Sequence, residues 1–133
     1  MTATVQYTTA LNCALTHLLS GITITTDAPP DNQGKGEAFS PTDLCATSLA
    51  ACMLTTMAIR IRDRGISIDG ARAEVTKIMA ADPRRISRIE VRLLMPQNQY
   101  SDADKKLLEH IALTCPVALS LHPDMEQVVE LVW

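Results

Sequence analysis

Apolar and polar residues alternate along several short stretches of the chain, which is the pattern of half-buried β-strands. The alternation is clear at Ala3, Val5 and Tyr7, near the start of the sequence. Six strands are predicted in this way, at residues 2–9, 11–18, 21–26, 69–80, 86–95 and 125–133. The turn residues 81–84 join two of these strands as a hairpin within residues 69–95.

A polar segment, residues 27–40, follows the N-terminal strands of residues 1–26. It is dense in Pro, Gly, Asn and Asp, which are residues of turns and loops. A loop of this length inside a small domain is long enough to be suspected of a function.

The longest predicted element is a helix over residues 41–64. Ser40 is suited to cap it, Pro41 takes the first helical position, and Asp43 places an acid where it complements both the cap and the helix dipole. Basic residues fill the last turn, and Gly65 follows as a stop signal. Both ends of this helix are therefore marked in the sequence.

This helix is apolar around nearly its whole circumference between Leu44 and Ile61, which indicates burial on every side. With about 24 residues it would be about 36 Å long. A chain of 133 residues does not easily cover such a helix alone, so we expect a second copy to cover part of it. The small residues offered to that partner are Ala46, Thr47, Ser48, Ala50 and Ala51.

A second helical region is predicted over residues 102–121. Ser101 and Asp104 have the spacing of a capping box at its start. The dipeptide Cys115-Pro116 interrupts the region, because proline lacks the N–H that a helix interior needs. The chain then restarts there as a second short helix.

Composition narrows the class of protein. Hydrophobic residues make up 47% of the chain and aromatic residues only 3%, so we expect one aliphatic core in a single α+β domain spanning residues 1–133. The net charge of -3 gives no electrostatic footprint for nucleic acid.

No stretch approaches the ~20 apolar residues of a membrane span, and the N-terminus lacks the layout of a secretory signal. We therefore expect a cytoplasmic protein that binds neither nucleic acid nor membrane.

The four cysteines are not spaced as metal ligands. The chain contains no CxxC pair, and no two histidines lie four residues apart, so we expect no metal site and no cofactor. In a reducing compartment the cysteines are either packed core residues or reactive thiols.

Cys52 lies mid-helix among apolar side chains, where a cysteine is either a small buried hydrophobe or a reactive thiol. Cys115 precedes Pro116, at the N-cap of a new helix, where unpaired N–H groups favour an anion and lower a thiol pKa. Packing is the alternative for Cys115 as well. Cys45 stands about 10.5 Å from Cys52 along one helix, which is too far for a disulfide. Cys52 and Cys115 lie on different helices and are free to meet, whereas Cys13 and Cys45 are interpreted as packed residues.

The run Ser40-Pro-Thr-Asp-Leu-Cys-Ala-Thr-Ser-Leu-Ala-Ala-Cys52 is followed 63 residues later by Cys115-Pro-Val. The two motifs, in this order, resemble the OsmC/Ohr family of thiol-dependent hydroperoxide reductases, and the order of elements matches along nearly the whole chain. The resemblance implies an OsmC/Ohr-like α+β fold, with antiparallel sheets packed on long central helices. It also implies an intertwined homodimer with active sites at the subunit interface.

By that resemblance Cys52 is the peroxidatic thiol and Cys115 resolves its sulfenic acid as a disulfide, which an external dithiol reduces. Peroxidatic members of the family place a Glu and an Arg beside the thiol. Here Thr42 stands at the Glu position, and no arginine precedes Arg60. The candidates for a supporting role are His17, Lys35, Glu37 and Asp43, each of which is alternatively an exposed or capping residue.

Three hypotheses follow. The first is a peroxidase-type enzyme that reduces organic hydroperoxides or peroxide in oxidative stress defence. The second is a dimeric protein on the same fold that is weakly redox-active or non-catalytic and binds or senses a small ligand. The third is a structural dimer whose thiols are inert.

Overall fold

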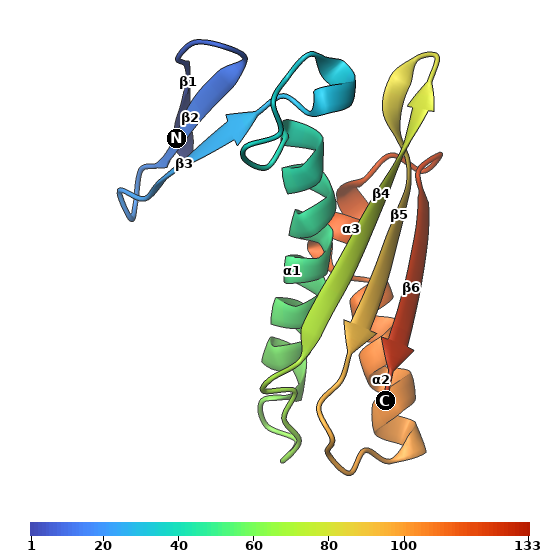
Figure 1. Cartoon of the computed structure of the whole chain (residues 1–133). Helices are drawn as coiled ribbons and strands as arrows, with labels where there is room; N and C mark the ends of the chain where they lie inside the picture. The colour runs from blue at the N-terminus through green and yellow to red at the C-terminus, as the bar shows by residue number, and fades with distance from the viewer. The chain divides into compact units, whose positions relative to one another are not determined.

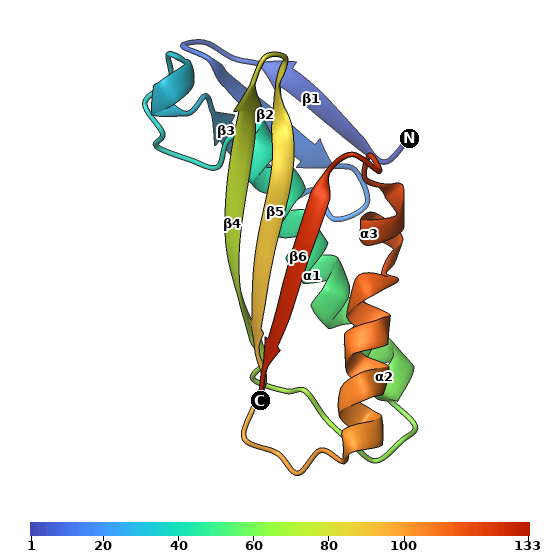
Figure 2. The ribbon, with the colours of Figure 1, turned by 90° about the vertical axis from the view of Figure 1, so that its right-hand side faces the viewer.

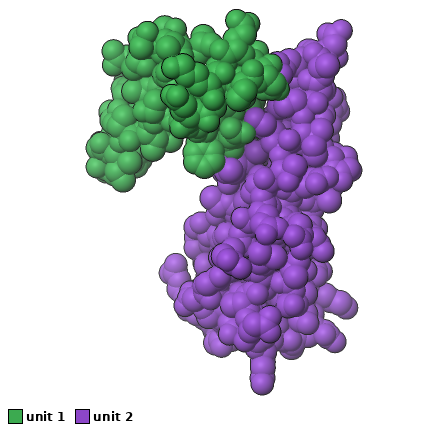
Figure 3. All heavy atoms as spheres, viewed as in Figure 1, with its two compact units in different colours: residues 1–45 green, residues 46–133 purple.

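The computed structural model describes all residues from Met1 to Trp133. The chain divides into two compact units, Met1–Cys45 and Ala46–Trp133 (Figure 3). Strands and helices occur together, and the α+β class is confirmed. The elements in chain order are β1 (Ala3–Tyr7), β2 (Asn12–His17), β3 (Thr23–Asp27), the 3-10 turn η1 (Pro30–Asn32), α1 (Pro41–Ile61), β4 (Arg72–Ala81), β5 (Arg84–Leu94), α2 (Asp102–Leu113), α3 (Pro116–Ser120) and β6 (Glu126–Val132).

The first unit is built on an antiparallel sheet in the order β1-β2-β3, drawn in blue in Figure 1. Val5 pairs with Leu15, and Leu15 pairs with Ile24, so these three apolar side chains share one face. On the other face Thr4 pairs with Thr16. Val5 is 66% exposed within the single chain, which leaves much of the apolar face open to water.

The polar loop after β3 is tied back to the end of that strand. The N–H of Asp27 donates to the Phe39 carbonyl at 3.1 Å, and the Asp27 carboxylate accepts the N–H of Glu37 at 3.0 Å. Gly34 passes so close to Ala28 that an added Cβ would lie 1.6 Å from the Ala28 carbonyl oxygen. Any side chain at position 34 would clash with the Ala28 backbone, so this close approach within the loop requires glycine.

Both predicted helix starts have capping boxes. At α1, the N–H of Asp43 donates to the Ser40 hydroxyl at 3.1 Å, and the N–H of Ser40 donates to the Asp43 carboxylate at 2.8 Å. Ser101 and Asp104 make the same reciprocal pair at α2. Helix α1 ends at Ile61, three residues before the predicted end, because residues 62–65 form a turn instead.

The second unit has its own sheet, in the order β4-β5-β6, and its helices lie on one face of that sheet (Figures 1 and 2). In β5 the residues Ile89, Val91 and Leu93 are at most 1% exposed, and they alternate with charged residues. Four residues of α1 form a buried stripe at intervals of four, which places them on one side of the helix. They are Leu49, Met53, Met57 and Ile61.

The expectation of purely antiparallel sheets is wrong for one strand pair. The first sheet and the β4–β5 hairpin are antiparallel, but β6 runs parallel to β5, with Val129 opposite Val91. The reason is the connection between the two strands. Helices α2 and α3 carry the chain back to the end of the sheet at which β5 begins, so β6 runs in the same direction as β5.

The outer face of this sheet carries exposed ion pairs. Arg92 lies between Glu74 at 2.7 Å and Glu130 at 2.9 Å, so one guanidinium connects all three strands. Arg88 joins Glu126 at 3.1 Å in the same manner. Exposed ion pairs of this kind contribute little stability. They join side chains of opposite charge on neighbouring strands, so they are consistent with the observed strand register on the face away from the helices.

The expectation that no stretch is long and apolar enough to span a membrane is wrong. Helix α1 meets both conditions over Pro41–Ile61, because its Ser and Thr residues lower the hydropathy less than charges would. The core helix of a globular protein passes the same test. Only 33% of its apolar window is buried within this chain, so the single chain leaves much of the helix uncovered.

Leu108 provides a test of the second core. It is fully buried in α2, whereas Leu113, on the same helix, is 52% exposed. We expect Leu108→Ala to lower the free energy of unfolding by about 2–5 kcal/mol, because it removes buried methyl groups and leaves a cavity. Leu113→Ala is the matched control and should change it by about 0.5 kcal/mol or less. Urea denaturation measures both, and equal losses in the two variants would contradict this assignment of the core.

Candidate active site

Two thiols meet inside the second unit. Cys52 lies on α1 and is half-buried, and Cys115 is fully buried at the N-cap of α3. The local sequence explains the position of Cys115, since Pro116 ends one helical run and begins the next. The Cys115 sulfur accepts the N–H of Ala118 at 3.5 Å, which is the predicted capping contact. All four cysteines of the chain are free thiols.

The Cys52 sulfur is surrounded by hydrogen-bond donors. The Thr56 hydroxyl, one helical turn further along α1, lies 3.8 Å from it. The backbone N–H of Val117 and the thiol of Cys115 also hydrogen-bond to it. Neither Thr56 nor Val117 was singled out from the sequence. The only sequence signal for Thr56 is its spacing of four residues from Cys52 on one helix.

These contacts decide the ionisation of Cys52. Burial of the thiol acts to raise its pKa, but the hydrogen bonds from the Val117 N–H, the Thr56 hydroxyl and the Cys115 thiol outweigh burial. The pKa of Cys52 is lowered as a result. Burial alone, which the sequence suggested for this position, would have had the opposite effect.

The ionisation of Cys115 differs from the sequence-based expectation. Burial raises the pKa of Cys115, and its hydrogen bond to Cys52 raises it further, while the N–H groups of Ala118 and Val117 lower it by less. The expected lowering of the pKa at a helix N-cap is therefore wrong for this thiol. A five-residue helix supplies a capping contact, but it does not compensate for complete burial.

The predicted supporting residues all belong to the first unit. His17 is exposed, and its Nδ1 lies 2.8 Å from the Ser20 hydroxyl. Glu37 and Lys35 are exposed in the loop. Asp43 caps α1 through Ser40. A role for any of them at the thiol pair stays a prediction.

The other two cysteines lie together elsewhere. Cys13 and Cys45, both half-buried, line an apolar hollow of about 430 Å³ in the first unit. Its remaining walls come from the apolar face of the first sheet and the first turn of α1. They are Val5, Leu15, Thr26, Pro41 and Leu44.

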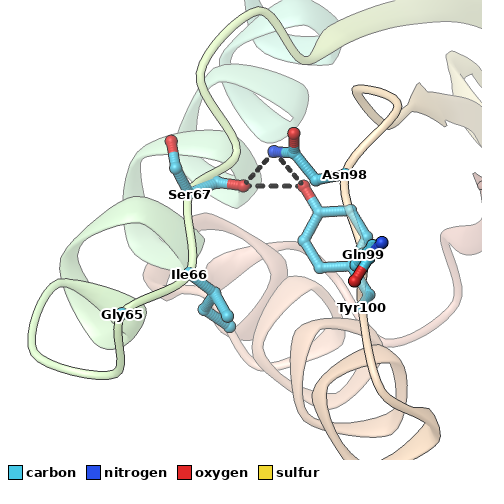
Figure 4. A pocket seen from close by; sticks show the side chains of 6 residues that line it. All are labelled: Gly65, Ile66, Ser67, Asn98, Gln99 and Tyr100. Carbon is cyan, nitrogen blue, oxygen red and sulfur yellow. Dashed lines mark hydrogen bonds between the residues drawn. The ribbon is translucent and has the colours of Figure 1, made fainter.

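A hollow of about 330 Å³ in the second unit lies between the loop after α1 and the loop before α2 (Figure 4). Two side chains close it by hydrogen bonds to a single carbonyl. Asn98 donates to the Ser67 carbonyl at 2.9 Å, and the Tyr100 hydroxyl donates to it at 2.7 Å. These bonds join the two loops, so we interpret this hollow as structural. No group of three or more His, Cys, Asp or Glu side chains has an arrangement that could hold a metal ion.

The opposite pKa shifts predict different pH dependences for the two thiols. A lowered pKa gives more thiolate at a given pH, so Cys52 should react with iodoacetamide at lower pH than an ordinary thiol. Cys115 should require higher pH than an ordinary thiol. Mass spectrometry of fragments that separate Cys45 from Cys52 follows each site. Identical pH midpoints for Cys52 and Cys115 would contradict the assignment.

Comparison with known proteins places this chain in a family. The family model described as OsmC-like protein matches residues 34–129, which include α1, α2 and both thiols. No protein of curated function matches the chain.

Solved structures give the same result over the full length. A Psychrobacter arcticus protein, described as an osmotic stress induced and detoxification response protein, is 52% identical, with a TM-score of 0.94. The match covers 99% of this chain and 96% of that one.

Two more distant structures share the fold. The organic hydroperoxide resistance protein OsmC of Legionella pneumophila is 16% identical with a TM-score of 0.74, and the match covers 100% of this chain and 98% of that one. The organic hydroperoxide resistance protein OhrB of Bacillus subtilis is 16% identical with a TM-score of 0.70, covering 99% and 98%. With the family model matched over most of its length and a relative of 52% identity, this chain belongs to the OsmC family.

Proposed function

We propose that this protein is a thiol-dependent peroxidase that reduces organic hydroperoxides or peroxide and acts in oxidative stress defence. The observation that carries the proposal is the hydrogen-bonded pair of Cys52 and Cys115, in which the more accessible thiol has the lowered pKa. The names of three similar structures, which refer to organic hydroperoxide resistance or a detoxification response, support it.

In the first step the Cys52 thiolate attacks the distal oxygen of the hydroperoxide. The O–O bond breaks, the sulfur becomes a sulfenic acid, and the departing alkoxide takes up a proton to become an alcohol. Cys52 suits this step because it combines a lowered pKa with partial exposure.

In the second step the Cys115 thiol condenses with the sulfenic acid of Cys52. An S–S bond forms, and the proton of Cys115 leaves with the sulfenic hydroxyl as water. An external dithiol then exchanges with this disulfide, becomes a disulfide itself and restores both thiols. The existing hydrogen bond between Cys52 and Cys115 indicates that little movement is needed.

We also propose that the protein acts as a homodimer in the cytoplasm. Members of this family are typically dimeric and soluble. The exposed apolar face of the first sheet and the uncovered part of α1 supply apolar surface for a second copy. A family of soluble proteins favours a core helix over a membrane span for α1.

The second candidate is a binding or sensing dimer with weak redox activity. Thr42 favours it, because its hydroxyl lies 3.1 Å from that of Ser40 in the cap of α1 and supplies no charge. Titration of the Cys52 thiol separates the two candidates, since a pKa at or above ~8.5 describes an unactivated cysteine.

Turnover of an alkyl hydroperoxide with a dithiol reductant tests the proposed function. We expect Cys52→Ser to reduce turnover to the uncatalysed background, because the attacking sulfur is gone. Cys115→Ser should still consume about one peroxide per site, but its rate of repeated turnover should be lower than that of the wild type. Cys45→Ser, on the same helix as Cys52, is the matched control and should keep wild-type turnover. Equal rates for wild type and Cys52→Ser would rule out the proposal.

Mild oxidation gives a separate test of the resolving step. After brief exposure to peroxide, intact mass and peptide mapping should find a disulfide between Cys52 and Cys115, because their thiols are already in contact. Cys13 and Cys45 should remain as thiols under the same conditions. A spectrum with oxidised Cys52 but no link to Cys115 would remove Cys115 from the mechanism.

A further inference from the structure

Within the second unit, the groups that favour the Cys52 thiolate are all neutral. They are a backbone N–H, a hydroxyl and a second thiol, and no cationic side chain is among them. A buried or half-buried anion without a cation depends on well-placed hydrogen-bond donors. Of the three donors, only the hydroxyl of Thr56 can be removed by substitution without altering the backbone or the second thiol.

Thr56 and its neighbour Thr55 have different surroundings on α1. Thr55 is exposed, and its hydroxyl donates to the Ala51 carbonyl at 2.8 Å, which is the usual bond of a threonine within a helix. Thr56 is half-buried, and its hydroxyl lies 3.8 Å from the Cys52 sulfur. The helix thus places one hydroxyl against its own backbone and the next against the thiol.

We propose that Thr56 is a catalytic residue of the thiol site, whose hydroxyl donates a hydrogen bond to the Cys52 thiolate and holds it for attack on the peroxide. Once the thiol proton has left, the sulfur only accepts hydrogen bonds, and a hydroxyl bond to an anion is stronger than one to a neutral thiol. The Thr56 contact therefore stabilises the thiolate more than the thiol. The direction of the Cys52 pKa shift agrees with this contribution.

Stabilisation by neutral donors suits the proposed attack step, on which the role of Thr56 in catalysis rests. A thiolate loses nucleophilicity as its pKa falls, and the best attacking thiol has a pKa near the ambient pH. Hydrogen bonds from the Thr56 hydroxyl and the Val117 amide lower the pKa of Cys52 and so raise its thiolate fraction at a given pH.

The pH dependence of Cys52 alkylation tests this role independently of peroxidase activity. We expect Thr56→Val, which keeps the shape of the side chain and removes the hydroxyl, to move the midpoint of Cys52 alkylation to higher pH by up to about one unit. At neutral pH, alkylation of Cys52 should be about three- to tenfold slower. Thr56→Ser retains the hydroxyl and should restore the wild-type midpoint.

Thr55→Val is the matched control, since it removes a hydroxyl from the adjacent position that contacts only the helix backbone. It should leave the Cys52 midpoint unchanged. Circular dichroism checks that each variant is folded. If Thr56→Val does not fold, Thr56→Ala is used in its place. An unchanged midpoint in Thr56→Val, or an equal shift in Thr55→Val, would overturn the proposal. A shifted midpoint in Thr56→Val with unchanged peroxide turnover would also overturn the catalytic role of Thr56. Absence of peroxide turnover in the wild type, with the Thr56 shift intact, would instead reject the peroxidase function and leave only the thiolate contact.

Discussion

The hydrogen bond between the thiols of Cys115 and Cys52 connects the packing of the second unit to its chemistry. Cys115 is held by the break between α2 and α3 and is fully buried, so it retains its proton and donates a hydrogen bond to the Cys52 sulfur. Cys52, with further donors around it, is the thiol that ionises. Two residues of the same type thus differ in ionisation because one is a buried donor and the other a half-buried acceptor.

Most of the fold could be predicted from local sequence signals. The caps at Ser40 and Ser101, the break at Pro116 and the alternation in β5 each act over a few residues, and each appears in the structure. The direction of β6 could not be predicted, because strand alternation is the same in parallel and antiparallel sheets. The family could be predicted because two motifs occur in a fixed order, and the comparisons confirm it.

The site was predictable in its residues but not in its electrostatics. Cys52 and Cys115 could be chosen from their positions in the helices, yet their pKa shifts depend on burial and on contacts between distant segments. The Val117 N–H is 65 residues from Cys52 in the sequence and has no side-chain signal. Thr56 resembles any other threonine in a helix until its hydroxyl is seen against the sulfur.

The three donors to Cys52 within the second unit are neutral, which has a consequence for the behaviour of this thiol in concentrated salt. A thiolate held by a nearby cation loses part of that attraction as ionic strength rises, because mobile ions screen the charges. A hydroxyl and an amide in direct contact with the sulfur are short-range dipoles, and salt screens them far less. The reactivity of this thiol should therefore persist when a cell loses water and its ions become concentrated.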